Sequence, residues 1–262
     1  MPGWSGRCRV IDTHCHLNFP SAFPDPAAEI AYARESGVDR LIVVGCDLES
    51  SHKAVELANQ FAEIYAVVGF HPTYTAHYTP EGLREVEEML KHPKAVAIGE
   101  IGLDYHWDYA TPEQQYRALR DQLDLAVSLD LPVVFHCREA YPDLLDLLEE
   151  RRDPVPMLFH CFAGDATDAR RAMALDCYFG VDGPLTYKKA EDLRTMVKDL
   201  LPRDRLVIET DAPYLTPTPH RGKPNRPGYV ALVSSMLATV WEVSREEAAK
   251  QTTENAVRFF RL

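Results

Sequence analysis

The sequence has no excess of positive charge. Its 262 residues include 28 Lys and Arg against 40 Asp and Glu, which gives a formal net charge of −12. This balance excludes a protein that holds nucleic acid by broad cationic attraction alone, so any phosphate chemistry has to be local. Long apolar runs are also missing. The longest, such as 64–69 and 131–135, are strand-sized and fall far short of the roughly 20 residues that span a membrane, so no membrane association is expected.

Other absences limit the organisation of the chain. The N-terminus has no long apolar segment of the signal-peptide kind. No low-complexity tract, short repeat or linker rich in Gly, Pro or Ser divides the sequence, so we expect a single domain over residues 1–262. Cysteine is scarce and spread along a large chain, whereas disulfide frameworks belong to short secreted chains. We therefore expect reduced thiols in a cytoplasmic protein, at Cys8, Cys15, Cys46, Cys137, Cys161 and Cys177.

Short apolar runs rich in β-branched residues alternate with longer segments of helical period. Runs without polar alternation are typical of parallel strands that are buried on both faces. Eight strand–helix units in about 250 residues predict an α/β protein with a (β/α)8 TIM-barrel fold. Strands are expected at 9–12, 40–44, 65–69, 95–99, 132–136, 157–160, 178–180 and 205–209. Helices are expected at 26–36, 50–61, 80–91, 111–130, 140–152, 165–175, 188–200, 229–241 and 245–260.

Metal-binding side chains gather at the ends of the predicted strands, where such barrels carry their catalytic groups. Five of the ten histidines fall there, which scattered surface histidines would not do. Residues two apart in an extended segment point to the same side. By this rule Asp12, His14 and His16 converge, as do His136 with Arg138 and Glu209 with Asp211, while the intervening Cys15, Cys137 and Thr210 face the helices.

Six of these strand-end residues are candidate metal ligands: His14, His16, Glu100, His136, His160 and Asp211. Imidazole and carboxylate ligands together suit Zn, Mn or Fe, and a carboxylate-rich site also accepts Mg. Six ligands exceed the need of one ion if water also binds. Two ions about 3.5–4 Å apart, bridged by a carboxylate, would use all of them. Glu100 comes from a middle strand and is the natural bridge.

At these residues the sequence resembles the TatD family of metal-dependent hydrolases, a branch of the amidohydrolase-type barrels. The resemblance runs from residue 10 to the C-terminus. After residues 136–138 the family often has a small residue followed closely by an acid, whereas AYPD stands at 140–143 here, so the role of Asp143 stays open. The matching elements are VIDTHCHLN (10–18), GFHP (69–72), GEIGLDY (99–105), PVVFHCR (132–138), HCFAG (160–164), LVIETDAP (206–213), RGKPNRP (221–227) and NAVRFF (255–260).

The resemblance implies a divalent-metal-dependent nuclease, often a 3′–5′ exonuclease on single-stranded DNA or RNA. It assigns His14, His16, Glu100 and Asp211 to one ion and Glu100, His136 and His160 to the other. The cofactors would be two divalent ions, Mg²⁺ or Mn²⁺, with Zn²⁺ as a further option. A water held between the ions would attack phosphorus. The partners would be ends of single-stranded nucleic acid, and no obligate protein partner is evident.

Three residues are expected to act in catalysis beside the ions. Glu100 and Asp211 serve as ligands, and Asp211 would also orient the water and accept its proton. His71, fixed by the turn at Pro72, is placed to touch a phosphate. Glu209 either joins Asp211 or packs beneath it, with a supporting role favoured. We expect Asp104 to cap a loop.

Further substrate contacts are expected around the strand ends. For Arg138, a phosphate contact and a structural salt bridge are equally compatible with the sequence. Residues 212–241 contain no acid and follow the eighth strand, where barrels often bind phosphate. This long loop supplies Arg221, Lys223 and Arg226 as candidate phosphate contacts. The aromatic residues beside the motifs that could stack on bases are Tyr105, Trp107, Tyr109 and Tyr214.

Two alternatives remain open at the level of the sequence. Related barrels cleave amides, lactones, esters or phosphotriesters, so a hydrolase of a small ester, amide or aminoacyl-tRNA bond is one alternative. The lysine that some relatives carboxylate to bridge their metals is replaced by Glu100, which disfavours dihydroorotase-like and phosphotriesterase-like sites. The second alternative is a non-catalytic barrel that binds metal or nucleic acid. A complete ligand set argues against it, because decayed sites usually lose ligands first.

Overall fold

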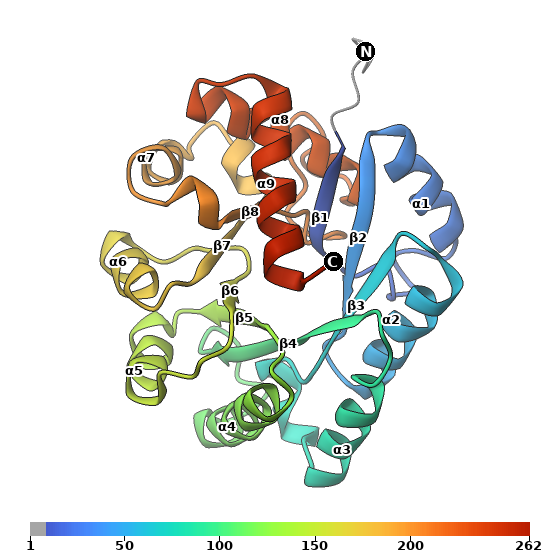
Figure 1. Ribbon diagram of the computed structural model, residues 1–262, viewed down its shortest axis with the longest axis vertical. Coiled ribbons are helices and arrows are strands. Elements are labelled where there is room, and N and C mark those ends of the chain that lie inside the picture. Colours follow the sequence, from blue (N-terminus) through green and yellow to red (C-terminus); the bar gives the residue numbers. More distant parts are fainter. Residues whose placement is uncertain (1–8) are drawn as a thin grey trace. The chain divides into compact units, whose positions relative to one another are not determined.

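Strands and helices alternate along residues 9–262, the part of the chain that the computed structural model describes (Figure 1). The eight strands form one sheet in the order β1 to β8, and the described pairings are parallel. This is the predicted (β/α)8 fold. The strands are β1 (Val10–Cys15), β2 (Val38–Val44), β3 (Ile64–Val68), β4 (Ala95–Asp104), β5 (Val133–Arg138), β6 (Met157–Phe159), β7 (Tyr178–Val181) and β8 (Leu206–Ile208).

Nine α-helices follow the strands within the described residues, and each lies where the sequence predicts a helix. They are α1 (Pro26–Glu35), α2 (Leu48–Gln60), α3 (Pro80–Met89), α4 (Pro112–Leu129), α5 (Tyr141–Arg151), α6 (Ala166–Ala174), α7 (Glu191–Asp199), α8 (Val230–Trp241) and α9 (Arg245–Phe260). Helix α7 begins three residues later than expected, because the 3₁₀ turn η2 (Gly183–Thr186) and a short connection precede it.

Strands β1 and β4 extend furthest beyond their predicted ends, and both carry site residues. Strand β1 continues to Cys15 instead of ending at residue 12, and β4 continues to Asp104 instead of ending at 99. His14 and Glu100 therefore lie within strands, where backbone pairing restricts them, and not in the loops that follow.

The chain divides into two compact units, of which the first contains the described residues 9–43 and Gly180–Leu262. Here β1 pairs with β2 in parallel, and Cys15 bridges to Ala212 beyond β8. Helix α9 packs against β1 and β8, and α8 packs against α9 (Figure 1). Helix α1 begins at Pro26, with the Asp25 side chain accepting from Ala28 N, and it ends before Gly37, whose left-handed backbone (φ 88°) favours glycine after a helix C-terminus.

The second unit, Val44–Phe179, carries β3 to β6 and the start of β7. Helix α2 packs on β3, α4 on β4 and α5 on β5. All ten residues of β4 are buried, as expected of a parallel strand covered on both faces. Helix α4 starts with Thr111 as its N-cap, which the Gln114 side chain completes as a capping box. The prediction of a single domain over residues 1–262 stays a prediction.

The cysteines behave as packing residues. No disulfide links the five that the structure describes, while Cys8 lies outside the described residues. Cys161 is half-exposed and the other four are buried. Burial raises the pKa of the Cys15 and Cys137 thiols well above the usual range, so both stay protonated, as befits side chains that fill space.

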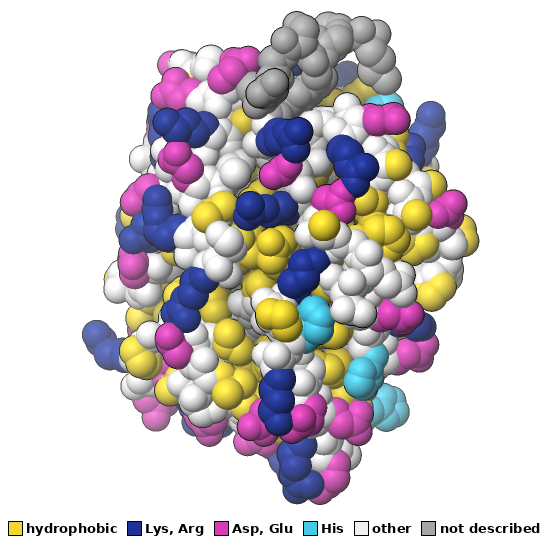
Figure 2. All heavy atoms as spheres, turned by 45° about the vertical axis from the view of Figure 1, so that its right-hand side comes forward, with side chains coloured by type: hydrophobic (Ala, Val, Ile, Leu, Met, Phe, Trp, Pro, Cys, Tyr) yellow, Lys and Arg dark blue, Asp and Glu magenta, His cyan; other side chains and the backbone are white. Residues whose placement is uncertain are grey.

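Two observations concern the surface and the helices. Among the side chains coloured in Figure 2, basic and acidic groups lie interspersed, without a broad area of one sign. Broad cationic adhesion is therefore not a property of this face. None of the helices within residues 9–262 is both long and apolar enough to cross a membrane.

Candidate metal-binding clusters

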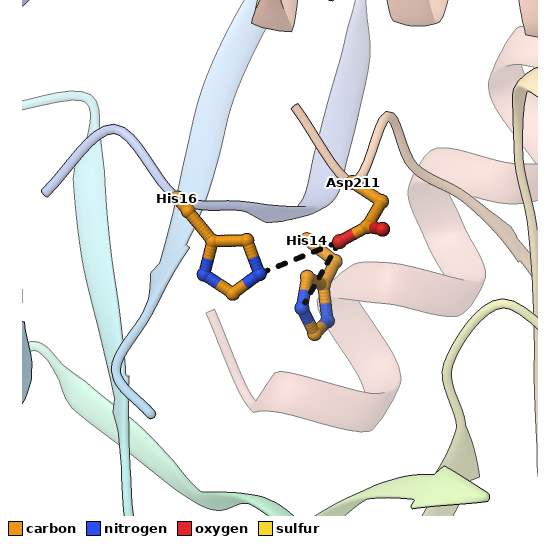
Figure 3. A group of neighbouring side chains, drawn as sticks. All are labelled: His14, His16 and Asp211. Carbon is orange, nitrogen blue, oxygen red and sulfur yellow. Dashed lines mark ion pairs between the residues drawn. The ribbon is translucent and has the colours of Figure 1, made fainter. Parts of the chain in front are cut away.

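His14, His16 and Asp211 come together in the first unit (Figure 3). Asp211 Oδ1 lies 3.4 Å from His16 Nε2 and 3.9 Å from His14 Nε2. The three residues offer ligand atoms that all lie within 4.8 Å of one another. The two imidazoles are buried, and the Asp211 side chain is 13% exposed. We call this group the HHD cluster.

Backbone hydrogen bonds hold the HHD cluster. Asp211 N donates to His14 O over 2.9 Å, and His16 N donates to Ala212 O over 2.8 Å. Asp211 has a left-handed backbone (φ 54°), which turns the chain sharply after β8. The ring of Phe19 stacks on His16, with centroids 4.7 Å apart and 8° between the ring planes. The ligand atoms are thus positioned by main chain and packing together.

The expected convergence of Asp12 with His14 and His16 is wrong. The Asp12 carboxylate accepts hydrogen bonds from Thr210 N (2.9 Å) and Thr210 Oγ1 (2.7 Å), and its Oδ1 also lies 3.3 Å from His14 N. Thr210 likewise does not face the helices. The parallel register of β1 shifts between Asp12 and Cys15, so the rule that residues two apart share a side fails there. Asp12 instead ties β1 to the turn that carries Asp211.

Burial dominates the electrostatics beneath the HHD cluster. It raises the pKa of Asp12 well above the usual range, against the lowering effect of the hydrogen bonds from Thr210. Glu209 is fully buried and lies 3.2 Å from the hydroxyl of Thr13, as a supporting residue would.

Glu100 is the centre of a second group, which lies entirely within the second unit. Its Oε1 is 2.8 Å from His160 Nε2, 3.0 Å from His136 Nδ1 and 3.8 Å from His71 Nε2. Glu100 and His160 are buried. His71, Glu100 and His136 offer ligand atoms within 4.8 Å of one another. We call Glu100, His71, His136 and His160 the Glu100 cluster.

His136 lies between two carboxylates. Its Nδ1 faces Glu100, and its Nε2 lies 2.7 Å from Asp104 Oδ2. Burial lowers the pKa of His136, but the hydrogen bonds with Asp104 and Glu100 outweigh it, and the pKa is raised overall. A ligand histidine usually donates its second N–H to a carboxylate, which fixes its tautomer and orientation. Asp104 provides this contact, so Nδ1 is the nitrogen left for a cation.

Asp104 also caps a loop, as predicted. Its Oδ1 accepts from His106 N (2.9 Å) and Trp107 N (3.1 Å). The same carboxylate therefore orders the loop after β4 with one oxygen and orients His136 with the other. The contact with His136 did not follow from the sequence, because it joins the ends of two different strands.

His71 is held in one tautomer. The backbone N–H of Thr73 points at Nδ1 over 3.2 Å, and a backbone N–H can only donate. Nδ1 is therefore the acceptor, which leaves Nε2 as the protonated nitrogen of a neutral ring. Burial, and next the nearby His136, lower the pKa of His71 to about 3. The ring is neutral at ordinary pH and presents an N–H donor.

Two buried glutamines of α4 support the Glu100 cluster, and sequence reasoning missed both. The Gln122 side chain accepts a hydrogen bond from Phe70 N (2.7 Å) through Oε1 and donates one to Phe70 O (3.2 Å) through Nε2, next to His71. The Gln115 side chain likewise accepts a hydrogen bond from Asp104 N (2.8 Å) through Oε1 and donates one to Asp104 O (2.9 Å) through Nε2. The signal was present in the sequence: the two glutamines are seven residues apart, so they share the apolar face of one helix.

The predicted substrate contacts divide into two kinds. Arg138, Arg221 and Lys223 are exposed. Within residues 9–262 the Arg138 guanidinium lies 5.8 Å over the Trp107 ring and forms no salt bridge, so the salt-bridge interpretation is wrong. Arg226, by contrast, bonds Glu29 of α1 at 2.8 Å and lies 3.6 Å over the Tyr32 ring, an arrangement typical of a structural residue.

Two further residues have roles that the sequence left open or hid. Asp143 accepts a hydrogen bond from Tyr105 Oη over 2.7 Å. Asn225 is fully buried in the acid-free loop, where its Nδ2 donates to Thr210 O (2.8 Å) and Tyr214 O (2.7 Å). The loop is thereby fastened to the turn that bears Asp211.

The donor sets of both clusters fit a divalent cation. Each combines imidazole nitrogen with carboxylate oxygen, and each is largely buried. Such sets suit Mn, Zn or Fe, and the carboxylates also accept Mg. Histidines and carboxylates buried this closely are costly unless charges balance, and a cation balances them.

Residues 11–261 match the family of TatD related DNases. The chain belongs to this family. It is 42% identical to the metal-dependent hydrolase YabD of Bacillus subtilis, over 97% of this chain and 99% of that protein. It is 35% identical to the 3′-5′ ssDNA/RNA exonuclease TatD of Cronobacter turicensis, over 88% and 90% of the two chains.

The solved structures agree. The structure of YJJV, a TatD homologue from Escherichia coli, superposes with a TM-score of 0.92 at 33% identity, covering 98% of this chain and 100% of that one. The TatD-family chain is thus a metal-dependent hydrolase with a (β/α)8 fold. Its resemblance to the family, noted from the strand-end motifs, is confirmed.

Proposed function

We propose that this TatD-family enzyme hydrolyses phosphodiester bonds at the 3′ end of single-stranded DNA or RNA. The proposal rests above all on two groups of imidazole and carboxylate ligands. The ligand atoms of the HHD cluster lie within 4.8 Å of one another, and Glu100 Oε1 lies 2.8 Å from His160 Nε2 and 3.0 Å from His136 Nδ1. The name of the Cronobacter relative adds the substrate class and the direction. The cofactors would be two divalent ions, Mg²⁺ or Mn²⁺, with Zn²⁺ a further option, bound by His14, His16, Glu100, His136, His160 and Asp211.

The ions would supply an activated water and stabilise charge on the phosphate. Protein side chains would accept the proton of the water and contact the phosphate. Asp211 is the more exposed carboxylate of the HHD cluster, which suits it to accept the proton of the attacking water. His71 is neutral and presents Nε2–H, so it donates a hydrogen bond to a phosphate oxygen.

Exposed cations would bind the rest of the strand. Arg138, Arg221 and Lys223 have the exposure that phosphate contacts need, whereas Arg226 already contacts Glu29. A few local cations suit a chain with a net charge of −12, because they attract a strand end without holding long duplexes. The cytoplasm is the proposed location, which the absence of disulfides among the described cysteines supports.

The test uses single-stranded DNA labelled at the 5′ end, incubated with Mg²⁺ or Mn²⁺. The expected result is a ladder that shortens from the 3′ end and stops on addition of EDTA. Glu100→Gln is expected to reduce the rate about a hundredfold or more, because it removes a central anionic ligand. Glu88→Gln is the matched control, since Glu88 is an exposed residue of α3 paired with Lys91.

A panel with double-stranded DNA, RNA and aminoacyl-tRNA separates the alternatives. Faster release of the aminoacyl group than of nucleotides would overturn the nuclease proposal. Unchanged turnover in a folded Glu100→Gln variant would overturn the assignment of the cluster. A protein that binds DNA but shows no turnover with Mg²⁺, Mn²⁺ or Zn²⁺ would be the non-catalytic alternative.

A further inference from the structure

The loop after β4 exposes two stacked aromatic rings. Trp107 is 44% exposed and Tyr109 is 63% exposed, although both are large apolar side chains. Their ring centroids are 5.6 Å apart, and the ring planes differ by 15°. We call the pair the aromatic platform. Large apolar rings that are exposed side by side are typical of a surface that binds a ligand or a partner.

The loop that carries the aromatic platform is held at both ends. Asp104 Oδ1 receives the backbone N–H of Trp107, and Gln115 Nε2 donates to Asp104 O (2.9 Å) and to Ala110 O (3.1 Å). Tyr105, the other aromatic residue of the loop, is fastened by its hydroxyl to Asp143. The rings are therefore preorganised, and the loop loses little conformational entropy when a ligand stacks on them.

A cation lies beside the rings. The Arg138 guanidinium is 5.8 Å over the Trp107 ring, is exposed and has no carboxylate partner among residues 9–262. The adjacent Glu139 is instead paired with His106, at 2.8 Å. Flat apolar rings next to an available guanidinium match a nucleotide, because a base has a π-face and its phosphate is an anion.

The aromatic platform is also tied to the Glu100 cluster. Asp104 holds Trp107 N with Oδ1 and His136 Nε2 with Oδ2. One carboxylate thus positions both the rings and a candidate metal ligand. A nucleotide on the rings and a phosphodiester at the cluster would share one rigid support.

We propose that the aromatic platform binds the bases of single-stranded nucleic acid by stacking, with Arg138 contacting the adjoining backbone. This inference deepens the proposed nuclease function and rests on it for the nature of the substrate. It gives a physical reason for a single-strand preference, since bases in a duplex have their faces covered by their neighbours. Tyr105, which is half-buried and bound through its hydroxyl to Asp143, is not part of the aromatic platform.

The test measures binding without turnover. In EDTA, fluorescence anisotropy follows binding of a 5′-fluorescein-labelled thymidine decamer and of an abasic decamer with the same backbone charge. Trp107→Ala and Tyr109→Ala are each expected to raise the Kd for the thymidine decamer about tenfold, the size of a lost stacking contact. Neither changes the weak binding of the abasic decamer. Trp107→Phe is expected to recover part of the affinity.

Two controls separate stacking from a structural effect. Leu129→Ala removes another exposed apolar side chain, 39% exposed at the end of α4, and is expected to leave the Kd unchanged. The Mn²⁺ affinity of Trp107→Ala, measured by calorimetry, is expected to match that of the wild type. In turnover assays the two alanine variants are expected to raise KM about tenfold and to leave kcat unchanged.

The outcomes distinguish the two proposals. Equal Kd values for wild type and both alanine variants overturn the aromatic platform, whatever the enzyme hydrolyses. A parallel loss of affinity for the abasic decamer overturns it too, because the rings would then act on the backbone. A wild type that binds bases through the rings yet degrades no nucleic acid overturns the nuclease proposal and leaves the aromatic platform standing.

Discussion

Asp104 Oδ2 lies 2.7 Å from Nε2 of His136. The contact crosses from the end of β4 to the end of β5, where the register places Asp104 opposite Arg138. It leaves Nδ1 of His136 directed at Glu100. The pair is a carboxylate and an imidazole whose other nitrogen is available to a cation, the arrangement that raises the basicity of a metal-binding histidine.

Asp104→Asn is therefore expected to weaken metal binding. The amide N–H₂ either repels the Nε2–H of His136 or forces the ring into its other tautomer, in which Nδ1 carries the proton. The Mn²⁺ affinity is expected to fall about 10- to 100-fold, measured by isothermal titration calorimetry. Asp108→Asn changes an exposed carboxylate of the same loop and serves as the control. Equal affinities in both variants would show that Asp104 serves the loop alone.

Each cluster is expected to contribute to the retention of metal. His16→Ala and His136→Ala are each expected to lower the metal content of protein purified without chelator, from near two ions per chain towards one. The measurement is elemental analysis of the folded protein. His52→Ala alters an exposed histidine paired with Glu85 and is expected to leave the content unchanged. A metal content still near two ions per chain in either cluster variant would exclude that histidine as a ligand.

The sequence was enough to predict the order of the elements and the gathering of the candidate ligands. Strand-end positions bring side chains together in any such barrel, so residue type and spacing sufficed for His136 and His160. The same reasoning failed for Asp12, because it assumed a regular strand and β1 shifts its register there. A register shift depends on how two strands pair, which no single segment encodes.

Contacts between distant segments were likewise beyond the sequence. Arg226 looked like a phosphate contact because its loop has no acid, but Glu29, far away in the chain, reaches it from α1. Charge counted along a segment does not include partners that the fold supplies. For Arg138 the sequence left a salt bridge open, but no carboxylate within residues 9–262 pairs with it.

Arg226 and Arg221 are expected to respond differently to replacement by Ala. Arg226→Ala removes an ion pair and a ring contact and is expected to lower the free energy of unfolding by about 1 kcal/mol, seen in urea titrations. Arg221→Ala is expected to lower stability less, because Arg221 is exposed and contacts the Tyr187 ring at 4.0 Å but has no ion pair within residues 9–262. It would instead raise KM for single-stranded DNA and weaken its salt dependence. A larger loss of stability in Arg221→Ala, together with a raised KM in Arg226→Ala, would contradict the roles given to the two arginines.

Asn225 is expected to be the least replaceable residue of the acid-free loop. It is fully buried, and its two N–H donors satisfy Thr210 O and Tyr214 O on either side of Asp211. Asn225→Ala leaves these carbonyls without donors, which is expected to cost about 1–3 kcal/mol in urea unfolding. Asn225→Asp is expected to cost more, since a carboxylate would face two carbonyl oxygens.

The same substitution is expected to loosen Asp211. Because Asn225 fastens both flanks of that turn, the Asn225→Ala variant should bind Mn²⁺ more weakly even where it remains folded. Lys223→Ala is the matched control, since Lys223 is exposed two residues away in the same loop. Lower stability with unchanged Mn²⁺ affinity would show that Asn225 holds the loop without positioning Asp211. Unchanged stability would contradict both roles, because a buried amide with two such bonds cannot be removed without cost.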